Sequence, residues 1–153
     1  TPAEERDRAN VFDIGLLAGR LLAANRWLRG RPVTGRLPLG YFGASTGAAA
    51  ALWAAAEPDA PVAAVVSRGG RPDLAGDRLA AVTAPTLLIV GGDDHAVLEL
   101  NRRAQARLRG DSRLVVIPGA THLFEEPGTL PAAAEAARDW FLAHLAADAE
   151  GVP

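Results

Sequence analysis

Residues 37–56 read LPLGYFGASTGAAAALWAAA, and this stretch decides the fold. The apolar run at 37–42 is typical of a buried strand, and the alanine-rich run at 46–57 is typical of a helix. Between them stands the G-x-S-x-G pattern Gly43-Ala44-Ser45-Thr46-Gly47. A serine in a sharp strand-to-helix turn of this kind has a strained backbone and an exposed hydroxyl above the end of a sheet. We expect both glycines to be required, because backbone approaches backbone closely in such a turn.

Two later residues could make Ser45 chemically active. Asp94 ends the apolar segment 85–94 after two glycines, and His122 follows the apolar segment 113–117 and a glycine turn. A serine hydroxyl is a weak nucleophile until a base takes its proton, and the base needs an acceptor that holds it in one tautomer. Each candidate follows the C-terminal end of its own predicted strand, and such ends form one rim of a parallel sheet. The sequence therefore predicts Ser45 as nucleophile, His122 as general base and Asp94 as the orienting acid.

Other residues compete for two of these roles. Asp93 is the alternative to Asp94, and either carboxylate could instead cap the helix predicted at 96–108. Of the two remaining histidines, His95 directly follows the acid and could line the cleft, whereas His144 is expected to be a packing or surface residue.

Thr46 and Arg68 are the candidate substrate-contacting groups. The backbone N–H of Thr46 opens a helix, where the helix dipole favours a developing oxyanion. Arg68 follows a strand end and could bind an anionic group, although it could equally pair with Asp73 or be solvated.

Glu125 and Glu126 are expected to favour the N-terminus of the last helix. No His or Asp spacing resembles a metal-ligand set, and the chemistry needs no cofactor.

Single strands alternate with helices along the chain. This order predicts an α/β fold with a mostly parallel sheet of about four strands flanked by helices. A helix begins at Asp13 and ends at Gly30, with an apolar stripe at three- and four-residue spacing. One domain is predicted at 1–147, followed by a flexible tail at 148–153. The other strands are predicted at 61–67, 86–90 and 113–117, and the other helices at 73–82, 96–108 and 130–145.

Composition excludes several function classes. The 153 residues suit one domain, and 49% hydrophobic with 22% charged residues supports a packed core. A net charge of −2 gives no basic face for nucleic acid. No apolar run approaches the ~20 residues of a membrane span. The absence of cysteine excludes thiol chemistry and fits a cytoplasmic location. Without lysine there is no phosphate-binding P-loop, and the glycines do not form G-x-G-x-x-G.

Four stretches carry a resemblance to a known family: YFGASTGAAAAL, SRGGRPDL, APTLLIVGGDD and IPGATHLFEEPG. Together they resemble α/β-hydrolases of the dienelactone-hydrolase-like group, in a bacterial subgroup often fused to a phosphoribosyltransferase domain. The likeness covers about residues 13–145. It implies the same nucleophile, base and acid, and it favours Asp94 because the family's acid comes three residues after the first glycine of the turn, here Gly91.

The front of the chain departs from that family. Only about 36 residues precede the predicted nucleophile strand, and they are predicted to be helical, so the family's early strands and second oxyanion donor have no counterpart. With no methionine anywhere, the chain is expected to be the C-terminal portion of a longer protein. Two hypotheses follow: a serine hydrolase acting on a small ester-type substrate, or an incomplete hydrolase-fold domain that serves as an interaction module. In either case a homodimer or an upstream domain would cover the exposed sheet edge.

Overall fold

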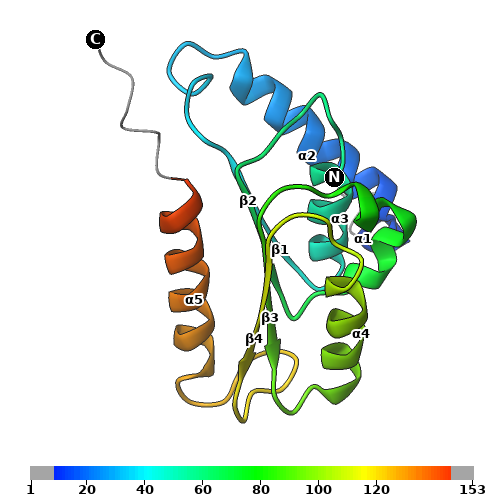
Figure 1. The fold of residues 1–153 in the computed structure, drawn as a ribbon, viewed down its shortest axis with the longest axis vertical. Coiled ribbons are helices and arrows are strands. Elements are labelled where there is room, and N and C mark those ends of the chain that lie inside the picture. Colours follow the sequence, from blue (N-terminus) through cyan, green and yellow to red (C-terminus); the bar gives the residue numbers. More distant parts are fainter. Residues whose placement is uncertain (1–8, 146–153) are drawn as a thin grey trace.

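A computed structural model describes residues 9–145, so the predicted tail at 148–153 lies outside the described part. Helices and strands alternate along the chain (Figure 1). Their bounds are α1 (Ala9–Phe12), α2 (Ile14–Arg29), β1 (Gly40–Ala44), α3 (Thr46–Ala55), β2 (Ala64–Arg68), the 3₁₀ segment η1 (Pro72–Ala81), β3 (Thr86–Gly91), α4 (His95–Gln105), β4 (Ser112–Ile117) and α5 (Thr129–His144).

The four strands form one parallel sheet in the order β1-β2-β3-β4. Helix α5 covers one face, and α2, α3 and α4 cover the other (Figure 1). Because every strand points the same way, the segments that follow the strands all leave at one end of the sheet. The predicted α/β fold is confirmed.

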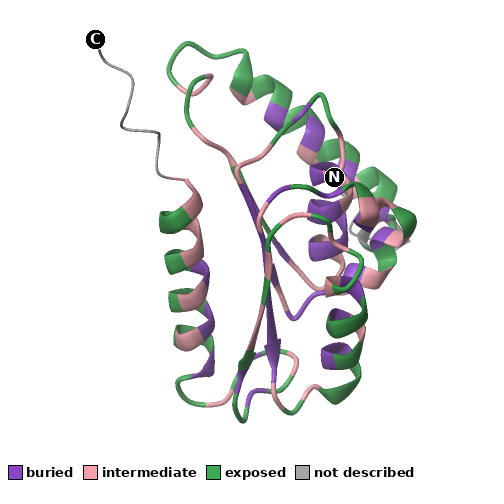
Figure 2. Ribbon diagram, in the orientation of Figure 1, coloured by how far each residue is buried: buried purple, intermediate pink, exposed green. Residues whose placement is uncertain are grey.

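Burial is greatest at the centre of the sheet (Figure 2). All six residues of β3 are buried, as is most of β2, whereas β1 and β4 are only partly covered. Continuous apolar runs without polar alternation are expected for strands of a parallel sheet that is covered on both faces. This is why the sequence showed strands as short apolar blocks.

Helix α2 begins and ends where the sequence predicts. The Asp13 carboxylate accepts a hydrogen bond from the backbone N–H of Leu16 at 2.9 Å, which caps the helix. Gly30 occupies the C-cap. No helix among residues 9–145 is long and apolar enough to cross a membrane.

Two predicted strand starts are wrong by three residues. Strand β1 begins at Gly40 rather than 37 and continues to Ala44, and β2 begins at Ala64 rather than 61. Pro38 and Pro61 lie among the residues that were predicted to belong to these strands but do not. Proline has no N–H to donate to a neighbouring strand. The other elements that were predicted from sequence agree with their bounds within three residues.

Candidate active site

Ser45 stands between β1 and α3 with φ 50° and ψ −121°. Only one other non-glycine residue in the described chain, Phe124, has a positive φ. Such a conformation costs an L-residue on the order of 1–3 kcal/mol, so the surrounding packing must impose it. Ser45 is half-buried, and its hydroxyl makes no hydrogen bond to the first turn of α3. The turn therefore has the strained geometry predicted from the pattern.

The two glycines of the pattern differ in their surroundings. A Cβ on Gly43 would collide with the carbonyl group of Gly47 and would lie 2.6 Å from Ala48 Cα. A Cβ on Gly47 would meet no atom of the described residues within 4 Å. The expectation that both glycines are required is therefore wrong for Gly47, because only at Gly43 would an added Cβ collide with backbone.

His122 and Asp94 are in direct contact. His122 Nδ1 lies 2.7 Å from Asp94 Oδ2. Asp94 occupies the N-cap position of α4, but its carboxylate makes no capping hydrogen bond and is directed to the imidazole instead. The Asp94 side chain is 14% exposed and that of His122 is 42% exposed. An acceptor sheltered from water thus orients a ring that solvent and small molecules can reach. Asp93, the alternative acid, is exposed.

The loop that carries His122 is held by two residues whose roles the sequence did not reveal. Phe124 has φ 60° and is 2% exposed, so its ring fills the α5 side of the core while its backbone turns sharply. The Glu126 carboxylate accepts hydrogen bonds from the backbone N–H of Thr121 at 3.1 Å and from its hydroxyl at 2.5 Å. The Glu126 carboxylate was expected to favour the start of the last helix, but it binds the histidine loop. The Glu126 carbonyl, rather than its carboxylate, contacts Thr129 at the helix start.

Glu126→Gln should weaken the histidine loop in a pH-dependent way. Hydrogen bonds donated first by the Thr121 hydroxyl and then by the Thr121 backbone N–H hold the pKa of Glu126 below its ordinary value of 4.5. A carboxyl with a lowered folded-state pKa stabilises the fold above its ordinary pKa, and that contribution is lost as pH falls through the lowered value. Glu126→Gln should therefore slightly lower the unfolding temperature at neutral pH, and the difference from wild type should vanish in acid.

Thermal unfolding of both proteins between neutral and strongly acidic pH measures this difference. Glu125→Gln removes the same charge one residue away without touching the two hydrogen bonds from Thr121, and it serves as the charge-matched control. A Glu126→Gln protein whose unfolding temperature follows wild type at every pH would contradict the role of this carboxylate.

Ser45 and His122 lie at the same end of the sheet, on either side of the segment 69–71. The Ser45 N–H donates to the Arg68 carbonyl at 3.4 Å, and Arg68 is the β2 partner of Ala44. The next residue, Gly69, packs beside the histidine, because a Cβ there would lie 3.3 Å from the His122 carbonyl oxygen and 3.8 Å from its Cε1. Within residues 9–145 no hydrogen bond joins the Ser45 hydroxyl to His122. Catalytic contacts are often loose before substrate binds.

The structure separates the alternatives left open for Arg68. Its guanidinium lies over the Phe124 ring, 5.3 Å from the centroid. Asp73, its suggested partner, instead binds the Arg71 side chain through two hydrogen bonds of 2.9 and 2.8 Å. Arg68 also lines a hollow of about 330 Å³ between the sheet edge and α5. Thr46 is the first residue of α3, as expected.

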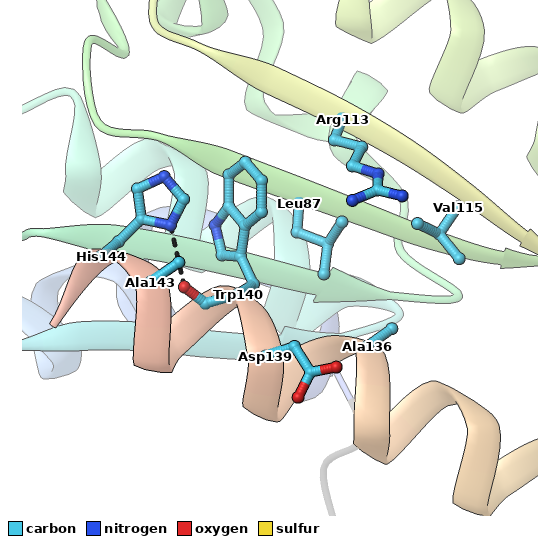
Figure 3. A pocket seen from close by; sticks show the side chains of 8 residues that line it. All are labelled: Leu87, Arg113, Val115, Ala136, Asp139, Trp140, Ala143 and His144. Atoms are coloured by element: carbon cyan, nitrogen blue, oxygen red, sulfur yellow. Dashed lines mark hydrogen bonds between the residues drawn. The ribbon is translucent and has the colours of Figure 1, made fainter.

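The remaining histidines lie apart from the His122–Asp94 pair. His95 is exposed at the start of α4. His144 Nδ1 is 2.8 Å from the Trp140 carbonyl oxygen, and the two rings are in contact at a tilt of 36°, with centroids 4.1 Å apart (Figure 3). They line a cavity of about 380 Å³ beneath α5 together with Leu87 and Arg113. Both of those residues are near the starts of their strands, so this cavity is at the opposite end of the sheet from His122. In the described part of the chain, no three His, Asp or Glu residues are placed to hold a metal ion.

A parallel sheet with a strained serine after one strand and a histidine–aspartate pair after two others defines the α/β-hydrolase class. Solved structures agree. The dienelactone hydrolase of Anabaena variabilis superimposes with a TM-score of 0.91 and 56% sequence identity over 94% of this chain and 67% of that one. The chain belongs to the dienelactone hydrolase family of α/β-hydrolases.

More distant structures share the fold alone. Est1E of Butyrivibrio proteoclasticus has a TM-score of 0.73 at 17% identity, covering 88% of this chain and 71% of that one.

Among curated proteins, one of Mycobacterium tuberculosis with a provisional phosphoribosyl transferase name is 68% identical over 145 residues, 95% of this chain. The chain spans only 33% of that relative's length. No protein-family model matches the chain.

Proposed function

We propose that the chain carries the catalytic residues of a serine hydrolase acting on an ester or related acyl substrate. The observation that carries the proposal is the 2.7 Å contact of His122 Nδ1 with Asp94 Oδ2, at the same end of the sheet as the strained Ser45. Membership of the dienelactone hydrolase family supports hydrolase activity on a small-molecule substrate. The absence of cysteine is compatible with the cytoplasm as its location.

The proposed reaction uses only side chains and backbone of this chain. His122 Nε2 takes the proton of the Ser45 hydroxyl as Oγ forms a bond to the substrate carbonyl carbon. His122 then gives that proton to the leaving alcohol as the ester C–O bond breaks, and water repeats the sequence to free Ser45. Asp94 holds the Nδ1–H tautomer and stabilises the imidazolium. The Thr46 N–H, at the positive end of the α3 dipole, stabilises the oxyanion.

Arg68 is proposed to bind an anionic group of the substrate. Its side chain makes a cation–π contact with Phe124, two residues after the proposed base. No carboxylate within residues 9–145 forms an ion pair with it. A guanidinium held by an aromatic ring keeps its full charge and its fork of donors. The substrate class that this favours is an ester that also carries a carboxylate or phosphate.

A scaffold role is the second candidate. In the described part of the chain β1 pairs only with β2, and this open edge favours the scaffold role. Phe42 on this edge strand is 53% exposed. It stands between two hollows, one of about 340 Å³ shared with Leu17 and Leu21 and one of about 330 Å³ shared with Leu130. An unpaired strand with apolar surface on both sides favours addition of another strand. We propose that a second copy or an upstream segment of the same polypeptide covers this edge.

The isolated chain should therefore self-associate and turn over esters weakly or not at all. Among residues 9–145 we assign one oxyanion donor, Thr46 N–H, and loss of one such donor typically costs ~10²–10³ in turnover. Solution mass and hydrolysis of an activated ester are measured on the chain alone and on the full natural polypeptide that contains it. Phe42→Arg should shift the isolated chain toward monomer, whereas Phe12→Arg, at another exposed phenylalanine, should not.

The ester assay also separates the two candidate functions. Hydrolysis by the full polypeptide supports the enzyme, and no hydrolysis of any activated ester favours the scaffold. A monomeric isolated chain that turns over as fast as the full polypeptide would contradict the role given to the β1 edge.

A further inference from the structure

The segment 69–71 touches both the proposed nucleophile and the proposed base. The Arg71 N–H donates to the Ser45 carbonyl oxygen at 3.0 Å, which fixes the backbone of the strained residue from outside the turn. At the other end of the segment, Gly69 has φ 52° and packs against the His122 backbone and ring. The segment therefore connects the backbone of Ser45 with the loop that carries His122.

The sheet and two helices hold the segment in place. The Gly69 N–H donates to the Ile89 carbonyl of β3 at 2.7 Å. On one side Gly70 is packed against the Ser67 hydroxyl and the first turn of α3, where an added Cβ would lie 2.5 Å from Ala48 Cβ. On the other side the Asn101 amide, from α4, donates to the Gly70 carbonyl oxygen at 3.0 Å. The same amide nitrogen donates to the Val97 carbonyl at 2.8 Å. The side chain of Asn101 is thus locked to its own helix while it binds the segment.

Asparagine at this position carries an energetic cost. Asn101 is fully buried, and its Oδ1 has no hydrogen-bond partner within the described residues. The nearby Ser67 hydroxyl is also buried without a partner. Each such orphan costs roughly 1–3 kcal/mol, and asparagine is a poorer helix former than leucine. An unpaired buried polar group beside a candidate active site is expected where that group takes part in the function of the site.

We propose that Asn101 is a positioning residue for the hydrolase reaction, which rests on the function proposed above. Its amide fixes the Gly70 carbonyl, the segment 69–71 fixes the Ser45 backbone through Arg71 N–H, and Gly69 sets the place of His122. Asn101 touches no reacting atom. It acts by keeping the nucleophile and the base at a fixed distance and orientation. A displacement of about 1 Å between such groups can cost on the order of 10²-fold in rate.

The test compares Asn101→Leu with Asn25→Leu in the full natural polypeptide. Asn25 is a matched control, since it is also buried on a helix and bridges elements, donating to the Tyr41 hydroxyl at 2.9 Å. Asn101→Leu should lower kcat for an activated ester by about 10- to 100-fold with little change in KM. It should also speed hydrogen exchange of the Arg71 amide. Its unfolding temperature should fall by no more than that of Asn25→Leu, because each variant leaves a buried acceptor without its donor. Asn25→Leu should lower the unfolding temperature but leave kcat per folded molecule unchanged.

Three outcomes decide the proposal. Normal kcat and normal Arg71 exchange in folded Asn101→Leu would overturn it. A kcat loss matched only by loss of folded protein, as in Asn25→Leu, would also overturn it. If wild type hydrolyses no ester, the proposed function fails, and faster Arg71 exchange in Asn101→Leu still establishes the positioning of the segment. Asn101→Asp, which replaces the donor with a carboxylate facing the Gly70 carbonyl, should slow the enzyme at least as much.

Discussion

Ser45→Ala should remove nearly all turnover of an activated ester by the full natural polypeptide, a loss on the order of 10⁶-fold. His122→Ala should cause a comparable loss, and the double variant should be little worse than either single one, because the three residues act as a unit. The physical reason is that the hydroxyl attacks only while a positioned base takes its proton. Steady-state kinetics of the four proteins measure the effect.

Matched controls exist within the chain. Ser112→Ala changes a serine at the start of β4, at the other end of the sheet, and His144→Ala changes the histidine in contact with Trp140. Both should keep wild-type turnover per folded molecule. Full activity in Ser45→Ala, or additive losses in the double variant, would refute the assignment of the triad.

Gly43→Ala should destabilise the fold by about 3 kcal/mol, because a methyl group has no room in the turn. The added Cβ would meet the Gly47 carbonyl and lie 2.6 Å from Ala48 Cα, and both neighbours are backbone atoms that cannot rotate away. Relief requires α3 to move relative to β1, which would also shift Ser45. Chemical denaturation of wild type and variant measures the change in the free energy of unfolding.

Gly47→Ala is the matched control for Gly43→Ala. A Cβ there meets nothing in the described residues, and alanine is favoured over glycine within a helix by up to about 1 kcal/mol. Gly47→Ala should therefore be neutral or slightly stabilising. Equal losses of stability in the two variants would show that the turn is not held by the close approach at Gly43.

Much of the fold could be predicted because its strands are short apolar blocks separated by helical patterns. The sheet type follows from that alternation, and Pro38 and Pro61 should have moved two strand starts toward the C-terminus. The choice of Asp94 over Asp93 rested on the family resemblance, which implies an acid three residues after Gly91, and the structure has the Asp94 carboxylate on His122. The residues alone left the two carboxylates open, because both follow the same strand end.

The residues that hold the site in place could not be predicted in the same way. The roles of Phe124 and Glu126 depend on a backbone turn and a hydrogen bond that form only after the loop folds. Asn101 left one signal: it is a polar residue on the otherwise apolar stripe of α4, with Val97, Leu98 and Ala104. A polar residue on a buried stripe indicates that its partner comes from another element, but it does not indicate which one.

Labelling with a serine-directed fluorophosphonate tests the central claim most directly. The full natural polypeptide is treated with the reagent, digested, and mapped by peptide mass. We expect one adduct, on Ser45, formed with loss of ester hydrolysis, absent in Ser45→Ala and strongly slowed in His122→Ala. An unlabelled Ser45 in a polypeptide that hydrolyses esters, or an adduct on another serine that abolishes activity, would contradict the assignment of Ser45 as the nucleophile.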